Sequence, residues 1–147
     1  IMIIKKSDIM DKLKKIKDTY KNRPFILQPF INSIKKDGEM SLIFFNKGFS
    51  HGLSKVPKKG DFRVQEEHGG TLELLKNLDD QIINLCKKVL SQLPYDCFYS
   101  RIDLVFDRGH PLLMEIEVIE PSLYFNLEPK SAKLFAKKVS DYFNRQC

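Results

Sequence analysis

Apolar residues recur at helical spacing near the start of the chain. The stripe consists of Ile9, Leu13, Ile16 and Tyr20. Ser7 precedes it as a candidate helix cap, and Pro24 follows it as a stop signal. The apolar residues 1–4 resemble the end of a strand. The pattern therefore predicts a strand end followed by one amphipathic helix.

Several later segments alternate or run apolar over lengths typical of strands. They are residues 25–31, 39–46, 49–56, 98–107 and 111–119. Residues 57–71 are rich in glycine and charge and predict a loop, whereas helices are predicted near residues 79–93 and after residue 130. Short turns between successive strands favour antiparallel pairing. The sequence predicts an α+β fold, a mostly antiparallel sheet with helices packed on one face.

The last two predicted strands carry charged residues on one face. Arg101 and Asp103 share a face of residues 98–107, and Glu115 and Glu117 share a face of residues 111–119. Matching the apolar faces pairs even-numbered residues with even-numbered ones, which a three-residue loop at 108–110 allows. This register predicts Asp103 opposite Glu115 and Arg101 opposite Glu117.

Asp103, Glu115 and Glu117 are therefore expected together, although like charges opposite one another destabilise a sheet. A hard divalent cation would offset their repulsion through carboxylate oxygens. A solvent-facing polar strand with Arg101 as the partner is the alternative interpretation. The hairpin by itself favours the two interpretations equally.

Four segments, in this order, resemble the ATP-grasp superfamily and its glutathione-synthetase-like branch. They are residues 28–31 (QPFI), 38–41 (GEMS), 55–65 (KVPKKGDFRVQ) ending in Gly69-Gly70, and 101–103 with 114–121 (RID, MEIEVIEP). Their joint order is more specific than any single match. Residues 120–125 (EPSLYF) are similar to ligases that act on amino acids or amino-acid-like substrates, such as the cycloserine-forming enzymes.

The resemblance implies an ATP-dependent ligase that joins a carboxylate to an amine through an acylphosphate. It implies that adenine and ribose are bound by Gln28, Pro29, Phe30, Ile31 and Glu39. It implies substrate or phosphate contacts from Lys55, Arg63, Gly69 and Gly70, with Arg63 as the catalytic cation. Asp103, Glu115 and Glu117 would hold Mg²⁺, or alternatively Mn²⁺, against the phosphates of ATP. Glu117 departs from the Asn that is usual in the family at that position.

The resemblance also implies a division of the chain. Residues 1–24 correspond to a remnant of the small ATP-grasp subdomain, and residues 25–147 to the C-terminal subdomain. We expect a fragment with little activity by itself, whose partner is the missing N-terminal part of the same protein. A small amino-acid or peptide-like substrate is implied, and dimers among relatives allow a homodimer.

Composition narrows the classes of function that this protein can have. The 147 residues carry a net charge of +6 and three widely spaced cysteines, which fit neither a disulfide framework nor a zinc site. The sequence contains no run of about eighteen apolar residues, so no membrane span is predicted. A reducing cytoplasmic setting is expected from the cysteines. Lysines decorate helix faces without a recognised module, so nucleic-acid binding is disfavoured. A metal-dependent phosphoesterase and a basic nucleic-acid-binding or interaction domain stay as the alternatives to the ligase.

Overall fold

The computed structural model describes residues 4–21, 23–64 and 69–144. It divides the chain into two compact units, residues 1–31 and residues 32–147. The sequence placed the division at residue 24, before the segment 25–31 rather than after it. No helix among the described residues is long and apolar enough to cross a lipid bilayer.

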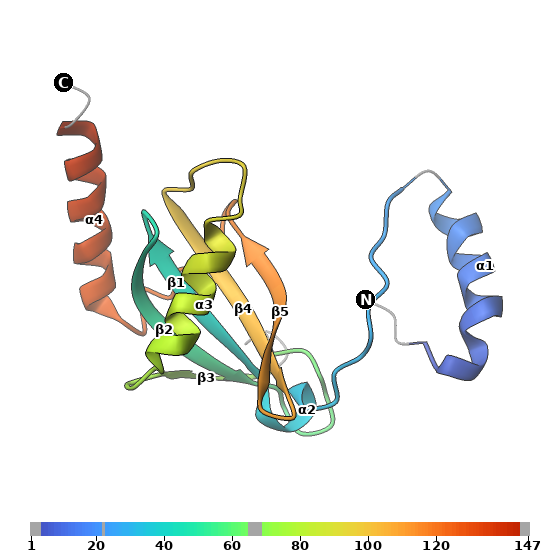
Figure 1. The fold of residues 1–147 in the computed structure, drawn as a ribbon. Coiled ribbons are helices and arrows are strands. Elements are labelled where there is room, and N and C mark those ends of the chain that lie inside the picture. Colours follow the sequence, from blue (N-terminus) through green and yellow to red (C-terminus); the bar gives the residue numbers. More distant parts are fainter. Residues whose placement is uncertain (1–3, 22, 65–68, 145–147) are drawn as a thin grey trace. The chain divides into compact units, whose positions relative to one another are not determined.

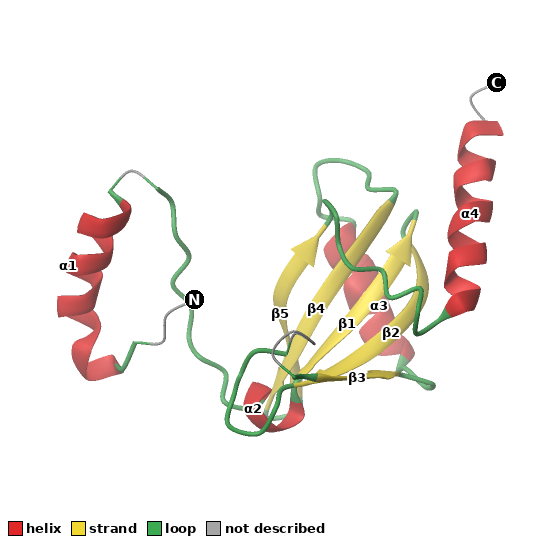
Figure 2. Ribbon diagram, turned by 180° about the vertical axis from the view of Figure 1, so that it is seen from behind, coloured by secondary structure: helices red, strands yellow, loops and turns green. Residues whose placement is uncertain are grey.

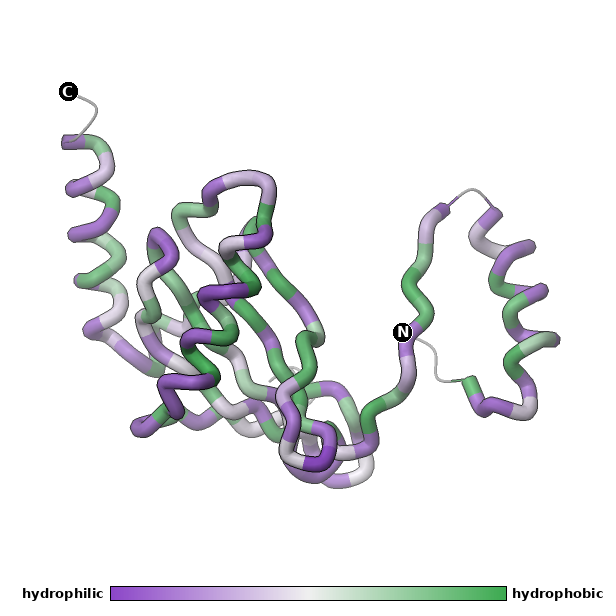
Figure 3. Tube along the Cα trace, in the orientation of Figure 1, coloured by the Kyte–Doolittle hydropathy of each residue, from purple (hydrophilic) through white to green (hydrophobic). Residues whose placement is uncertain are grey.

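Unit 1, residues 1–31, contains the first predicted helix. A 3-10 turn, Lys6–Asp8, leads into α1, Ile9–Tyr20 (Figure 1). Ser7 donates its hydroxyl to the Asp8 carboxylate at 2.6 Å, and no side chain caps the helix start, so the predicted Ser7 cap is wrong. Hydrophilic and hydrophobic residues alternate along α1 (Figure 3), and none of its residues is fully buried.

The strand predicted over residues 25–31 is wrong, because residues 23–31 adopt no regular structure. A strand needs a neighbour to receive its backbone hydrogen bonds. All strands of the described residues belong to the sheet of unit 2. Ile26 is consequently 89% exposed despite its apolar side chain. Of the strand end predicted at residues 1–4, residues 1–3 lie outside the described residues and Ile4 is not in a strand.

Unit 2, residues 32–147, is built on a five-stranded antiparallel sheet (Figure 2). The strands are β1 (Glu39–Phe45), β2 (Gly48–Val56), β3 (Thr71–Leu74), β4 (Tyr99–Asp107) and β5 (His110–Glu117), in the spatial order β3-β2-β1-β4-β5. The helices are α2 (Ile34–Asp37), α3 (Asp80–Leu90) and α4 (Pro129–Asn144). The predicted α+β fold is confirmed. Strand β3 was not predicted, although its Thr-Leu-Glu-Leu sequence alternates as a strand does.

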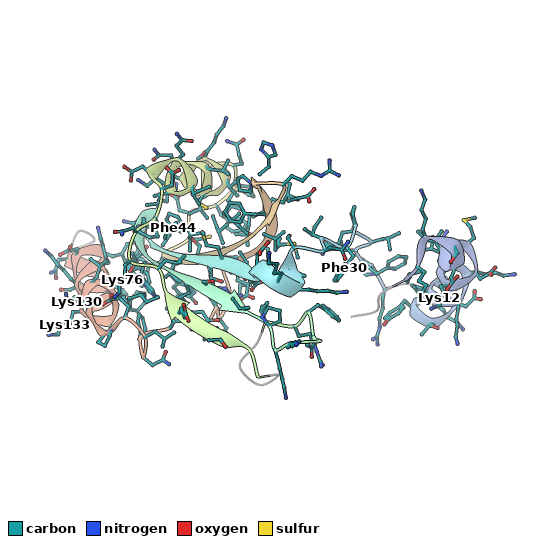
Figure 4. The ribbon with its side chains drawn as sticks, turned by 90° about the horizontal axis from the view of Figure 1, so that it is seen from below. Lys12, Phe30, Phe44, Lys76, Lys130 and Lys133 are labelled. Carbon is teal, nitrogen blue, oxygen red and sulfur yellow. The ribbon has the colours of Figure 1, made fainter. Side chains whose placement is uncertain are left out.

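Helix α3 covers one face of the sheet. Asp79 caps it by accepting a hydrogen bond from the backbone N–H of Gln81 at 2.8 Å. Cys86 and Leu90 pack against the even-numbered residues of the two central strands, Leu42, Phe44, Ile102 and Leu104. Phe44 is labelled in Figure 4, within this layer. The helix predicted near residues 79–93 is thus confirmed, and its apolar side forms part of the main core.

The opposite face of the sheet is covered by other elements. The helices were predicted to pack on one face only, and they do not. Ile43, Phe45 and Leu53 pack there against residues of the segment 123–127 and against Phe135 of α4. The Phe135 ring lies 5.0 Å from that of Phe45 and 5.7 Å from that of Phe125, between ring centroids. Further along α4, Phe143 is 62% exposed.

Candidate metal and nucleotide site

The three predicted carboxylates meet on the sheet face opposite α3. Asp103 of β4 pairs directly with Glu115 of β5, and Arg101 pairs with Glu117, which confirms these two predicted pairs. Ligand oxygens of Asp103, Glu115 and Glu117 all lie within 4.8 Å of one another. Asp103 is buried, whereas the Glu115 side chain is 57% exposed. The group is thus open to a ligand on its Glu115 side.

The hairpin reaches this register by a route that the sequence did not predict. Its loop has two residues, Arg108 and Gly109, both with positive φ, instead of three. A two-residue loop reverses the parity of the pairing, so Leu104 pairs with Leu113. A bulge at Met114 then inserts one extra residue into β5 and restores the pairing of Asp103 with Glu115.

Arg101 binds these carboxylates from within the same face. Its Nε donates to both oxygens of Asp103 at 3.0 and 3.1 Å, and its Nη2 donates to Asp103 Oδ2 at 2.8 Å and to Glu117. Burial would lower the pKa of Arg101, but the bonds to Asp103 and the charge of Glu117 outweigh it and raise the pKa. Arg101 is therefore a permanent cation of the site.

Strands β1 and β2 extend the site with a second buried cation. Lys55 Nζ lies 2.8 Å from Glu39 Oε1 and 3.7 Å from Asp103 Oδ1, and 5.7 Å from the centre of the Tyr124 ring. Ser41, the β1 partner of Asp103, donates its hydroxyl to Asp103. Two residues from separate sequence motifs, Glu39 and Lys55, are thus joined to the carboxylates because they are partners across β1 and β2.

The site holds more negative than positive charge. In the ion pairs given for the described residues, the four carboxylates of Glu39, Asp103, Glu115 and Glu117 share two cations, Arg101 and Lys55. Burial raises the pKa of Glu115, and the charges of Glu117 and Asp103 raise it further. A hard cation bound through oxygen would relieve this repulsion, so the donor set fits Mg²⁺ or Mn²⁺.

Known proteins share both the sequence and the arrangement of these strands. The family described as prokaryotic glutathione synthetase, ATP-grasp domain, matches residues 1–131. The chain belongs to this ATP-grasp family. The family resemblance read from the four sequence segments is thereby confirmed.

One individual relative is matched both in sequence and in structure. The cycloserine biosynthesis protein DcsG of Streptomyces lavendulae is 30% identical, over 79% of this chain and 41% of its own length. The crystal structure of D-cycloserine synthetase DcsG superposes with a TM-score of 0.63 at 25% identity, covering 78% of this chain and 41% of that chain. The chain thus spans less than half the length of these relatives.

A further ATP-grasp structure shares the fold. D-alanine–D-alanine ligase from Bacillus anthracis in complex with ATP superposes with a TM-score of 0.56 at 16% identity. The superposition covers 94% of this chain and 45% of that chain. At this identity the likeness establishes the common architecture alone.

The remaining predicted site residues belong to other segments of the chain. Arg63 is exposed and pairs with Asp61, through its Nη2 to Oδ2 at 2.7 Å, and so holds the pKa of Asp61 well below its usual range. Gly69 has a φ of +79°, as its predicted loop role requires, and Gly70 follows it. Residues 65–68 of the same predicted loop lie outside the described residues. The predicted adenine segment, residues 28–31, belongs to unit 1.

Sequence reasoning missed Ser41 and Tyr124 as members of the site. Ser41 follows Glu39 by two residues and so shares its face, a parity signal available in the sequence. Tyr124 has no such signal, because it reaches Lys55 through an irregular segment. His51 holds that segment: its Nε2 donates to the Leu123 carbonyl oxygen at 3.1 Å, while its Nδ1 accepts from Ser50 at 2.9 Å. Burial lowers the pKa of His51, which suits this neutral structural role.

Proposed function

We propose that this chain carries the Mg²⁺–ATP site of an ATP-dependent ligase that joins a carboxylate to an amine through an acylphosphate. The observation that carries the proposal is the group of Asp103, Glu115 and Glu117 on one sheet face of an ATP-grasp domain. Phosphoryl transfer depends on charge neutralisation and positioning more than on proton transfer. A site with surplus carboxylates and two buried cations suits that requirement.

Each group of residues has a distinct part in the proposed site. Asp103, Glu115 and Glu117 would hold the metal ion, which would neutralise the phosphate oxygens of the bound nucleotide. Glu39 would bind the ribose, and the Lys55 ammonium holds the Glu39 carboxylate in place at 2.8 Å. Arg63 is exposed, and its Nε and Nη2 donate hydrogen bonds to the Asp61 carboxylate. In the proposed reaction its guanidinium would bind the phosphate or the acyl group instead.

The relatives suggest the substrate class. One is named for cycloserine biosynthesis, and another joins D-alanine to D-alanine. We therefore propose an amino-acid or amino-acid-like substrate for the whole protein. Residues 1–24 would belong to the smaller nucleotide-clamping subdomain and residues 25–147 to the C-terminal one. Helix α1 is amphipathic and has no fully buried residue, as expected of a helix whose apolar side packs against the rest of that smaller subdomain.

Thermal protection by nucleotide tests the proposal on this chain directly. We expect ATP at about ten times its dissociation constant to stabilise the protein by about 1.4 kcal/mol with Mg²⁺ present. We expect no protection in EDTA. Glu115→Gln should abolish the Mg²⁺-dependent part, because it removes one ligand charge. Glu115 suits the test because its exposed side chain contributes little to the fold.

A matched control removes a carboxylate elsewhere on the same sheet. Glu73→Gln changes an exposed residue of β3, at the opposite edge from β5, and should leave the protection intact. Equal protection of the Glu115→Gln and unchanged proteins would overturn the metal assignment. Hydrolysis of p-nitrophenyl phosphate would favour the phosphoesterase, and a steep salt-dependent affinity for DNA would favour the nucleic-acid-binding domain.

A further inference from the structure

Arg101 already places a cation among the three carboxylates. Its Nη2 lies 2.8 Å from Asp103 Oδ2, donates a hydrogen bond to Glu117, and lies 4.0 Å from Glu115 Oε2. One nitrogen atom thus reaches all three side chains whose oxygens are grouped as metal ligands. A second donor, Nε, is anchored on both oxygens of Asp103.

The present position of Nη2 conflicts with a bound divalent ion. Mg²⁺ lies about 2.1 Å from its oxygen ligands. An ion bound to Asp103 Oδ2 would then lie within about 4.9 Å of Nη2, since Nη2 is itself 2.8 Å from that oxygen. Arg101 and Asp103 are both buried, so water screens the repulsion between the two cations only weakly. The Glu117 oxygen that accepts from Nη2 is shared with that cation, which weakens it as a ligand for the ion.

We propose that Arg101 is a tethered cation that fills the divalent-metal position in the metal-free protein and must withdraw from Glu117 before the ion binds. This inference rests on the proposed metal site. The movement is confined to the side chain, because the Arg101 backbone is paired with Ile43 on one side and Glu117 on the other. Arg101 is therefore a positioning residue that keeps the carboxylates together without metal and lowers the affinity of the site.

Mn²⁺ binding to the 147-residue chain without nucleotide tests the competition. Free Mn²⁺ is measured by electron paramagnetic resonance during a titration. We expect Arg101→Gln to bind Mn²⁺ about tenfold more tightly or better, because a neighbouring positive charge is removed. Lys47→Gln removes the same charge from an exposed pair with Asp96 and should change the affinity by less than about twofold.

The opposite result has a definite meaning. If Arg101 only braces the carboxylates beside the metal, Arg101→Gln loosens the ligands and binds Mn²⁺ equally or more weakly, which overturns the inference. Glu115→Gln separates this failure from failure of the proposed function. Weaker Mn²⁺ binding in Glu115→Gln keeps the metal site, whereas unchanged binding there removes the site and the inference with it.

A measurement on the unsubstituted protein covers the case in which Arg101→Gln does not fold. The Arg101 Nε–H signal is followed by ¹⁵N nuclear magnetic resonance during a titration with Mg²⁺, which is diamagnetic. Arg101→Lys assigns the signal by its loss. We expect it to shift and saturate with Mg²⁺, while the Nε–H signal of Arg63, bonded to Asp61, stays in place as a reference. An Arg101 signal that does not move at saturating Mg²⁺ would overturn the proposal.

Discussion

Lys55 allows the energetics of the charged network to be tested separately from ligand binding. Its side chain is 5% exposed and its ammonium lies 2.8 Å from Glu39 and 3.7 Å from Asp103. Burial would lower the pKa of Lys55, but Asp103 and Glu39 outweigh it and raise the pKa. The favourable ion pairs of the Lys55 ammonium therefore outweigh the free energy lost by removing it from water. A raised folded pKa means that this stabilisation is fully present below the ordinary pKa of 10.5 and is lost as the pH rises through the folded pKa.

Lys55→Met keeps the aliphatic stem and removes the charge at neutral pH. Removing one partner of a buried pair costs about 3–5 kcal/mol, because it leaves an uncompensated charge. We expect the lower end, about 3 kcal/mol, since Arg101 and Ser41 still bind Asp103. In a chain of this size the thermal midpoint should then fall by about 6–12 °C.

Urea unfolding at pH 7, followed by circular dichroism, measures the loss. Lys47→Met is the matched control: its side chain is 51% exposed in a pair with Asp96, so it should cost no more than about 1 kcal/mol. Adding Glu39→Gln to Lys55→Met should recover part of the loss, because the stranded carboxylate is neutralised. A cost for Lys55→Met below about 1 kcal/mol, or equal to that of the control, would refute the reasoning.

Two further substitutions test the backbone and the carboxylates. Gly38 has a φ of +71°, and a Cβ added there would lie 2.0 Å from the Lys55 carbonyl oxygen, so Gly38→Ala should destabilise by more than about 3 kcal/mol in urea unfolding. Gly109→Ala, with a φ of +82° and open space around its Cβ, should cost only about 1 kcal/mol, and equal costs would contradict the steric argument. The raised pKa of Glu115 favours its protonated form in the fold, so this favourable contribution is present below the ordinary pKa of 4.5 and is lost as the pH rises through the folded pKa. In EDTA, the thermal midpoint of the unsubstituted protein should fall as the pH rises through this range, and Glu115→Gln should remove that fall. A pH profile that Glu115→Gln leaves unchanged would contradict the reasoning.

The strands of unit 2 were predictable because their side chains alternate with a period of two. Parity alone placed Asp103, Glu115 and Glu117 on one face, and the structure agrees. The alternation of side chains does not predict the bulge at Met114. A loop shorter by one residue shifts the pairing, and the bulge shifts it back, so both routes give the same pairs at Asp103 and Arg101. The predicted grouping of the three carboxylates is therefore confirmed, although the predicted loop was wrong.

The failed prediction at residues 25–31 has a different physical cause. An apolar run indicates that a segment prefers burial, but a strand also requires a partner for its backbone hydrogen bonds. Whether a partner exists is a property of the assembled sheet. No strand among the described residues pairs with this segment, and Ile26 stays exposed.

The sequence by itself determined the local facts: which residues alternate, which face carries the acids, and which family the ordered segments resemble. Only the tertiary structure decided that Lys55 links Glu39 to Asp103, that the Lys55 ammonium lies over the Tyr124 ring, and that Arg101 Nη2 lies among the three acids. These contacts join residues from different strands and from an irregular segment, so no periodicity along the chain encodes them. Their arrangement depends on strand order, on register and on the need to pair buried charge.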